Sequence, residues 1–178
     1  MTSTQYYVAG SIDGYIADAD NRLDWLFQFN GTAGLGEHYE SFFAGVGALA
    51  MGASTYEFIL AEEHDHWPYE GRTTWVFTHR DLPKFDGADI VFTRADVAEV
   101  HTEMVASAGE RNVWLVGGGD LVAQFAERSL LDEIVLAVAP VTLGGGAPLL
   151  PARVDAPMRL DQVETVGDFA ILHYTVRP

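Results

Sequence analysis

Three consecutive glycines, Gly117, Gly118 and Gly119, separate the apolar stretch VWLV from an apolar helical pattern. Because glycine has no Cβ atom, such a run lets another group approach the backbone closely. The first turn of a helix adds free N–H groups and roughly half a positive charge, which favour an anion. The motif therefore predicts contact with a diphosphate, with a tight strand–helix turn or a non-proline cis peptide as the structural alternative.

Two other expected strand ends carry groups that suit a phosphate. In MGASTYEF, Ser54 or Thr55 is expected to cap a helix that follows a buried strand. In FTHRDLP, Thr78, His79 and Arg80 offer a hydroxyl, an imidazole and a guanidinium, which together suit a phosphate monoester. Taken alone, each segment also has a purely structural interpretation: the first as a capped helix, the second as a solvated loop. Because ligands of open α/β sheets lie beyond the carboxyl ends of the strands, the three ends together favour a nucleotide site.

Two familiar kinds of site are not supported by the sequence. Val122 stands where the dinucleotide-binding fingerprint has its third glycine, and neither glycine run matches a Walker loop, so a Rossmann domain is not expected. Glu62, His64 and His66 in EEHDHW are of metal-ligating types, but the segment reads as a loop without a further histidine at helical spacing. We interpret it as a solvated acidic loop and expect no metal site.

The elements that must position these groups follow from hydrophobic periodicity. Strands are expected at residues 5–11, 46–52, 73–79, 88–93, 112–116, 131–143 and 168–177. Helices are expected at residues 22–29, 36–45, 53–60, 95–109 and 120–129. Strands that alternate with helices indicate a mainly parallel sheet with right-handed crossovers. The last two strands have no helix between them, which indicates an antiparallel edge, so the predicted fold class is α/β with a mixed sheet.

Composition narrows the class of protein. The chain has 178 residues, a formal net charge of −16, one lysine (Lys84) and no cysteine. We expect one domain over residues 1–178 and a cytoplasmic location, because there is no disulfide framework, signal peptide or apolar run of the ~20 residues that cross a bilayer. The negative charge argues against nucleic acid and anionic membranes as partners.

The order of these motifs resembles the dihydrofolate reductase superfamily, in particular the RibD C-terminal type of the riboflavin biosynthesis reductase. The segments that carry the resemblance are SIDGYIA, MGASTYE, FTHR, VWLVGGGDLVAQF and PVTLGGGAPLL. It implies a dihydrofolate reductase-like three-layer fold, with NADPH across the carboxyl edge of the sheet as hydride donor. On this resemblance, the cofactor-binding residues are Ala9, Ile16, Gly52, Ala53, Ser54, Thr55, Thr78, His79, Arg80, Val116, Gly117, Gly118, Gly119 and Leu121.

The resemblance also implies a substrate side. Asp24 is the nearest match to the carboxylate that promotes protonation in dihydrofolate reductases, and Asp13 is a second acidic residue near the pocket. Both have structural alternatives, because aspartate is common in the first turn of a helix and in Asp-Gly turns. Tyr15, Trp25 and Leu26 would form an apolar, aromatic pocket for a flat heterocycle.

The sequence therefore predicts an NADPH-dependent reductase of a pterin or similar heterocycle. A reductase of a ribosylaminopyrimidine in riboflavin biosynthesis is the alternative substrate reading, and a non-catalytic nucleotide-binding module is the alternative without turnover. A homodimer is expected, paired along an edge formed by strands 133–141 and 168–177.

Overall fold

The structure is a computed structural model that describes residues 1–63 and 65–176. Its main sheet has the strand order β5-β4-β3-β6-β1-β7-β10-β9. These strands are β1 (Thr4–Ser11), β3 (Val46–Gly52), β4 (Thr73–Phe77), β5 (Ile90–Thr93), β6 (Asn112–Gly117), β7 (Glu133–Ala139), β9 (Arg159–Val166) and β10 (Phe169–Thr175). The strands from β5 through β7 pair in parallel, whereas β10 is antiparallel to both β7 and β9.

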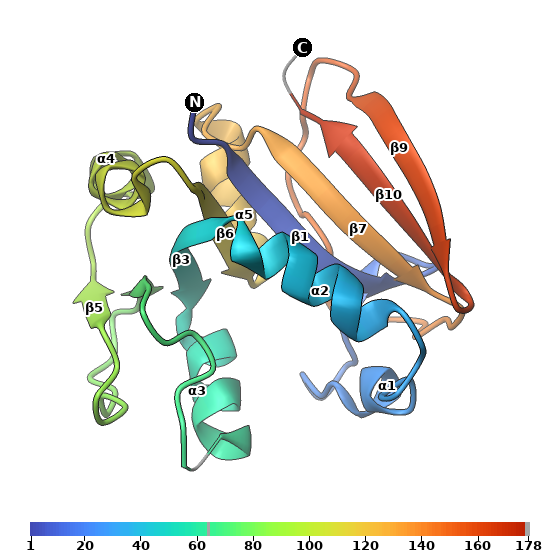
Figure 1. The fold of residues 1–178 in the computed structure, drawn as a ribbon, viewed down its shortest axis with the longest axis horizontal. Coiled ribbons are helices and arrows are strands. Elements are labelled where there is room, and N and C mark those ends of the chain that lie inside the picture. Colours follow the sequence, from blue (N-terminus) through green and yellow to red (C-terminus); the bar gives the residue numbers. More distant parts are fainter. Residues whose placement is uncertain (64, 177–178) are drawn as a thin grey trace.

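Helices cover both faces of the sheet, which gives three layers (Figure 1). They are α1 (Asp24–Phe27), α2 (Leu35–Ala44), α3 (Ala53–Glu62), α4 (Val97–Ala108) and α5 (Gly119–Glu127). Side chains of α4 and α5 form one core cluster with Tyr6 and Leu115 of the sheet. Side chains of α2 and α3 form another with Leu49 and Trp114 on the opposite face. Successive side chains of a strand point to opposite faces, so the central strands are apolar throughout.

A second, two-stranded sheet lies beyond the carboxyl end of β1. It pairs β2 (Tyr15–Ala17) with β8 (Ala147–Pro148) in antiparallel fashion. The two backbones approach so closely that a Cβ atom on Gly146 would lie 2.0 Å from the carbonyl oxygen of Ala17. The second glycine run of the sequence therefore serves, at Gly146, a contact within the chain.

The α/β fold class, the mainly parallel sheet and the antiparallel C-terminal edge are confirmed, and this edge contains one strand more than expected. Strand β7 lies between β1 and β10, and β9 covers the other side of β10. The sequence does not reveal β9 because nearly all of its side chains are exposed on both faces, which removes the alternation that marks a strand. The homodimer stays a prediction, but neither strand that was expected to form its edge is an edge strand.

Two other boundaries differ from expectation. The helix expected at residues 22–29 is the single turn α1, and the loop after β1 contains the short strand β2. Within the residues that the structure describes, no helix has the length and apolar character needed to cross a membrane.

Candidate active site

A cavity of about 390 Å³ opens at the carboxyl ends of β1 and β6, beside the first turns of α3. Its walls are mainly apolar. Aromatic side chains contribute much of the surface, and they are Tyr7, Phe58, Tyr69 and Trp114. Polar atoms come from Asn21, Ser54 and Thr55. Among the described residues that line it, none carries a formal charge.

The cavity brings together eight of the residues proposed from the sequence, namely Ala9, Ile16, Leu26, Ser54, Thr55, Val116, Gly117 and Gly118. Ala9 lies in β1, and Val116 lies in the neighbouring strand β6. Ile16 lies in β2, the short strand that pairs with β8. Residues from five separated segments therefore share one cavity because parallel strands end at the same edge.

The three glycines of the strand–helix turn meet different surroundings. Gly117 has φ +138°, a conformation that side-chain-bearing residues rarely adopt, and its peptide bond to Gly118 is cis. A Cβ atom on Gly119 would lie 2.3 Å from the carbonyl oxygen of Pro148, so this glycine admits the chain's own β8 segment. A Cβ atom on Gly118 would meet nothing within 4 Å and would point into open space at the cavity.

Two helix N-termini lie side by side at this edge. Helix α5 starts after β6 and helix α3 starts after β3, and β3 and β6 are neighbours in the sheet. Gly118 and Gly52 are the N-cap residues, and within the described chain no side chain caps either helix. The expected cap by Ser54 or Thr55 was wrong, because Gly52 is the N-cap residue and both hydroxyls lie in the first turn of the helix. Uncapped first turns leave N–H groups free for an anion.

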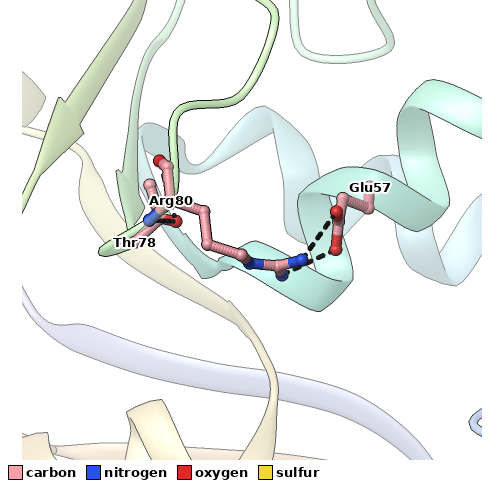
Figure 2. Close-up of polar contacts among 3 residues, drawn as sticks. All are labelled: Glu57, Thr78 and Arg80. Atoms are coloured by element: carbon pink, nitrogen blue, oxygen red, sulfur yellow. Dashed lines mark hydrogen bonds and ion pairs between the residues drawn. The ribbon is translucent and has the colours of Figure 1, made fainter.

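Thr78, His79 and Arg80 follow β4, one strand beyond β3. Figure 2 shows the Arg80 side chain reaching from this segment to Glu57 on α3. Its two terminal nitrogens donate to the carboxylate oxygens of Glu57 at 2.9 and 2.7 Å. Thr78 is buried, and its hydroxyl accepts a hydrogen bond from the Arg80 backbone N–H at 3.0 Å. The threonine thus shapes the turn from which Arg80 and the exposed His79 project.

A second arginine that sequence reasoning missed lies beside this segment. A cavity of about 180 Å³ is lined by Thr78, Arg80 and Arg94, among others. Arg94 directly follows β5, which pairs in parallel with β4, and its guanidinium is 3.3 Å from a carboxylate oxygen of Asp81. The available signal was its position after an expected strand, equivalent to that of Arg80.

The two candidate acids do not line the main cavity. The Asp13 carboxylate accepts hydrogen bonds from the Ser11 hydroxyl at 2.6 Å and from the backbone N–H groups of Leu143 and Gly144 at 3.0 and 2.7 Å. These bonds lower the pKa of Asp13 to about 2, the Ser11 bond most, so the group is an anion that joins two loops. Asp24 is an exposed residue at the start of α1.

Other proposed residues adjoin the cavity without lining it. Trp25 is buried in a core cluster with Ile171 and Phe169, and Tyr15 pairs with Pro148 in the small sheet. Ala53 and Gly119 are adjacent in the chain to residues that line the cavity, and Gly52 and Leu121 lie two and three residues from the nearest one.

The four aromatic side chains Tyr7, Phe58, Tyr69 and Trp114 form the aromatic wall of the cavity. They were not predicted from the sequence, although strand periodicity indicates two of them. Tyr7 precedes Ala9 by two residues on β1, and Trp114 precedes Val116 by two on β6, so each pair shares a face. Burial raises the pKa of Tyr7 to about 12, which keeps its phenol neutral and able to donate a hydrogen bond. Tyr69 comes from a loop whose place in space no local pattern specifies.

Comparisons with known proteins agree with this architecture. The RibD C-terminal domain family matches residues 60–172. The uncharacterized protein YwjB of Bacillus subtilis is 32% identical over 172 residues, which cover 96% of each chain. A Shewanella sp. PV-4 structure, named provisionally for riboflavin biosynthesis, superposes with a TM-score of 0.82 at 24% identity over 98% of each chain.

Dihydrofolate reductase from Enterococcus faecalis, solved with NADP(H), shares the fold at a lower level of similarity. Its TM-score is 0.61 at 16% identity, over 97% of this chain and 94% of that one. The family match spans more than half of the chain, and the relative in Bacillus subtilis extends it to nearly the whole length. The chain belongs to the RibD C-terminal domain family and has a dihydrofolate reductase-like fold.

Proposed function

We propose that this protein is an NADPH-dependent reductase that transfers a hydride to a flat heterocycle. The observation that carries the proposal is the continuous row of groups at the carboxyl ends of β4, β3, β6 and β1. Adjacent strands lie about 4.8 Å apart, so this row spans about 14 Å. It runs from Arg80, with Arg94 beside it at the end of β5, past two uncapped helix N-termini, to a largely apolar cavity.

The middle of the row fits a diphosphate. The open space at Gly118 lets an anion reach the backbone, and Thr55 and Ser54 add hydroxyl groups from the neighbouring helix. Each helix N-terminus contributes roughly half a positive charge. Two such ends in adjacent positions offset much of the charge of a diphosphate without any lysine.

The outer end of the row fits the 2′-phosphate that distinguishes NADPH from NADH. Arg80 and Arg94 supply two guanidinium groups there. Arg80 is paired with Glu57, but both side chains are about half exposed, and exposed ion pairs contribute only about 0–1 kcal/mol. Release of Arg80 from Glu57 therefore costs a bound phosphate little, and hydrogen bonds between charged groups contribute about 1.5–3 kcal/mol to its binding.

The inner end of the row suits hydride transfer. Bound NADPH supplies the hydride, and the protein has to orient the reacting rings and exclude water. Ala9 and Ile16 lie where they would flank the nicotinamide, and the aromatic wall offers a flat surface for the second ring. The cavity volume lies within the roughly 300–1,000 Å³ usual for small-molecule sites.

The absence of charge among the described lining residues favours an uncharged ring, such as a pterin, as substrate. The family favours a second candidate, a ribosylaminopyrimidine that carries a phosphate. Its phosphate would have to reach Arg22, which is exposed on the segment before α1. Asp24 is the residue proposed to promote protonation of the substrate, and this role requires α1 to turn its exposed first residue toward the cavity.

A turnover assay separates these readings. Purified protein is mixed with NADPH and either dihydrofolate or 5-amino-6-(5-phosphoribosylamino)uracil, and both NADPH loss and the reduced product are measured. We expect NADPH oxidation coupled to reduction of dihydrofolate. Turnover of only the phosphorylated pyrimidine would establish the second candidate. NADPH binding without turnover of any heterocycle would indicate a nucleotide-binding module.

A further inference from the structure

A cluster of ligand-type side chains lies on the sheet beside the cavity, outside the groups used above. It consists of His38 on α2, Glu164 on β9 and His173 on β10. One ligand atom from each residue lies within 4.8 Å of the other two. We propose that these three side chains bind a divalent transition metal ion of the zinc type.

The distances suit such an ion. The Nε2 atom of His173 lies 2.9 Å from Oε1 of Glu164, and Nε2 of His38 lies 3.7 Å from the same oxygen. Zinc binds imidazole nitrogen and carboxylate oxygen at about 2.0–2.2 Å, so ligand atoms of a tetrahedral site lie about 3.3–3.5 Å apart. One measured separation is shorter than this range and the other is longer. Small side-chain rotations would bring the three ligand atoms around one ion.

A hydrogen bond behind His38 prepares its free nitrogen. The Tyr7 hydroxyl lies 3.0 Å from Nδ1 of His38, and the two rings stack with centroids 5.6 Å apart. In the tautomer with the proton on Nδ1, this N–H donates a hydrogen bond to the Tyr7 oxygen. Nε2 is then unprotonated and faces Glu164. Metal-ligating histidines are usually held in this manner by a partner at the other ring nitrogen.

The fold brings the three residues together from distant parts of the chain. Tyr7 is opposite Val135 of β7, and Val135 is opposite His173 of β10. Glu164 is opposite Ile171, two residues before His173, so the carboxylate is a diagonal neighbour of His173 on the same face. Helix α2 lies over β1 in Figure 1, and its His38 contacts Tyr7 of that strand.

The site is accessible without being fully open. The side chains of His38, His173 and Glu164 are 13%, 28% and 34% exposed. Two imidazoles and one carboxylate leave room for a water ligand, which is a usual composition for a protein site of zinc. The net charge of −16 favours a cation over an anion at such a position. A bound ion would join α2 to the β9–β10 hairpin.

The experiment titrates the full-length protein, free of any affinity tag and of metal, with ZnCl₂ by calorimetry and with CoCl₂ by visible absorption. We expect one Zn²⁺ per chain and the visible bands of low-coordinate Co²⁺. The midpoint temperature of thermal unfolding should rise by about 5 °C or more when the free Zn²⁺ concentration is a hundredfold above its Kd. His173→Ala and Glu164→Gln should abolish the Co²⁺ bands, and Tyr7→Phe should weaken binding about 10- to 100-fold.

His66→Ala is the matched control, because His66 is exposed in the acidic segment considered above and lies outside the cluster. It should bind Zn²⁺ as the wild type does. The proposal is overturned if the wild type binds no metal, which leaves a histidine–glutamate ion pair. It is equally overturned if His173→Ala binds like the wild type, or if only His66→Ala loses binding.

Discussion

Gly117, Gly118 and Gly119 are adjacent in the chain, yet each is required for a different reason. Gly117 is fixed by its backbone conformation, Gly119 by the carbonyl of Pro148, and Gly118 only by what enters the cavity. The sequence predicts that something approaches these glycines. It cannot show that for one of them this is the chain itself, because the contact with β8 joins residues far apart in sequence.

A matched pair of substitutions separates these roles. Gly118→Ala should change the free energy of unfolding by less than about 1 kcal/mol, because its Cβ meets open space and its φ of −75° is accessible to alanine. It should weaken NADPH binding, since the methyl group occupies the proposed diphosphate position. Gly119→Ala should destabilise the protein by about 1–3 kcal/mol, because its Cβ would overlap the Pro148 carbonyl.

Chemical denaturation and calorimetry measure the two effects on the same samples. Gly118→Ala that binds NADPH like the wild type would remove the diphosphate from this turn. Equal stability of the two variants would contradict the close approach of β8.

Arg80 and Glu57 give the second residue-level prediction. Arg80→Ala should weaken NADPH binding about 10- to 100-fold and leave NADH binding unchanged, because it removes charged hydrogen bonds to the 2′-phosphate. Glu57→Gln should strengthen NADPH binding severalfold, because it frees the guanidinium from a competing carboxylate. Calorimetric titration of both nucleotides into each variant checks this. A loss of NADH affinity as large as that for NADPH would show that Arg80 supports the fold instead.

At the level of elements, Asp13 joins the turn after β1 to the loop before β8. Its carboxylate pKa lies at about 2, below the usual value of about 3.9, because the Ser11 hydroxyl and two backbone N–H groups bind the anion. A lowered pKa stabilises the folded state above the unfolded-state pKa, and this contribution is lost as the pH falls through the folded-state value.

Asp13→Asn should therefore lower the midpoint of thermal unfolding by a few degrees at pH 7. The gap between variant and wild type should close as the pH falls from about 4 toward about 2. Scanning calorimetry across this range checks the prediction. A gap that stays constant over the whole range would mean that the charge of Asp13 does not hold the two loops.

The elements differ in how far the sequence could predict them. Strand β3 is evident because all but its last residue are buried, and α4 is evident from its apolar stripe and from Gly109 at its end. Strand β9 is not evident from the sequence. Its apolar residues, such as Leu160 and Val163, are exposed, and the strand has no buried residues with which they could alternate. The cavity wall follows the same rule. The resemblance to the family predicted residues such as Ile16 and Leu26, whereas Trp114 and Tyr69 reach the cavity through tertiary packing.

At the scale of the whole molecule, we propose one domain for residues 1–178. The main sheet runs from β5 to β9, and the strands at its centre pair residues from both halves of the chain. Denaturant unfolding should therefore show one cooperative transition, coincident by tryptophan fluorescence and by far-ultraviolet circular dichroism. Two separated transitions would mean that the β7–β10–β9 portion unfolds independently of the rest.

We propose that NADPH binds along the carboxyl edge of the sheet, with its 2′-phosphate at the arginines after β4 and β5. Calorimetric titration of the wild-type protein with NADPH and with NADH tests this binding. We predict one NADPH site per chain and an affinity for NADPH at least about tenfold higher than for NADH, because only NADPH reaches Arg80 and Arg94. Absence of binding by both nucleotides would contradict the reductase proposal and leave only the fold.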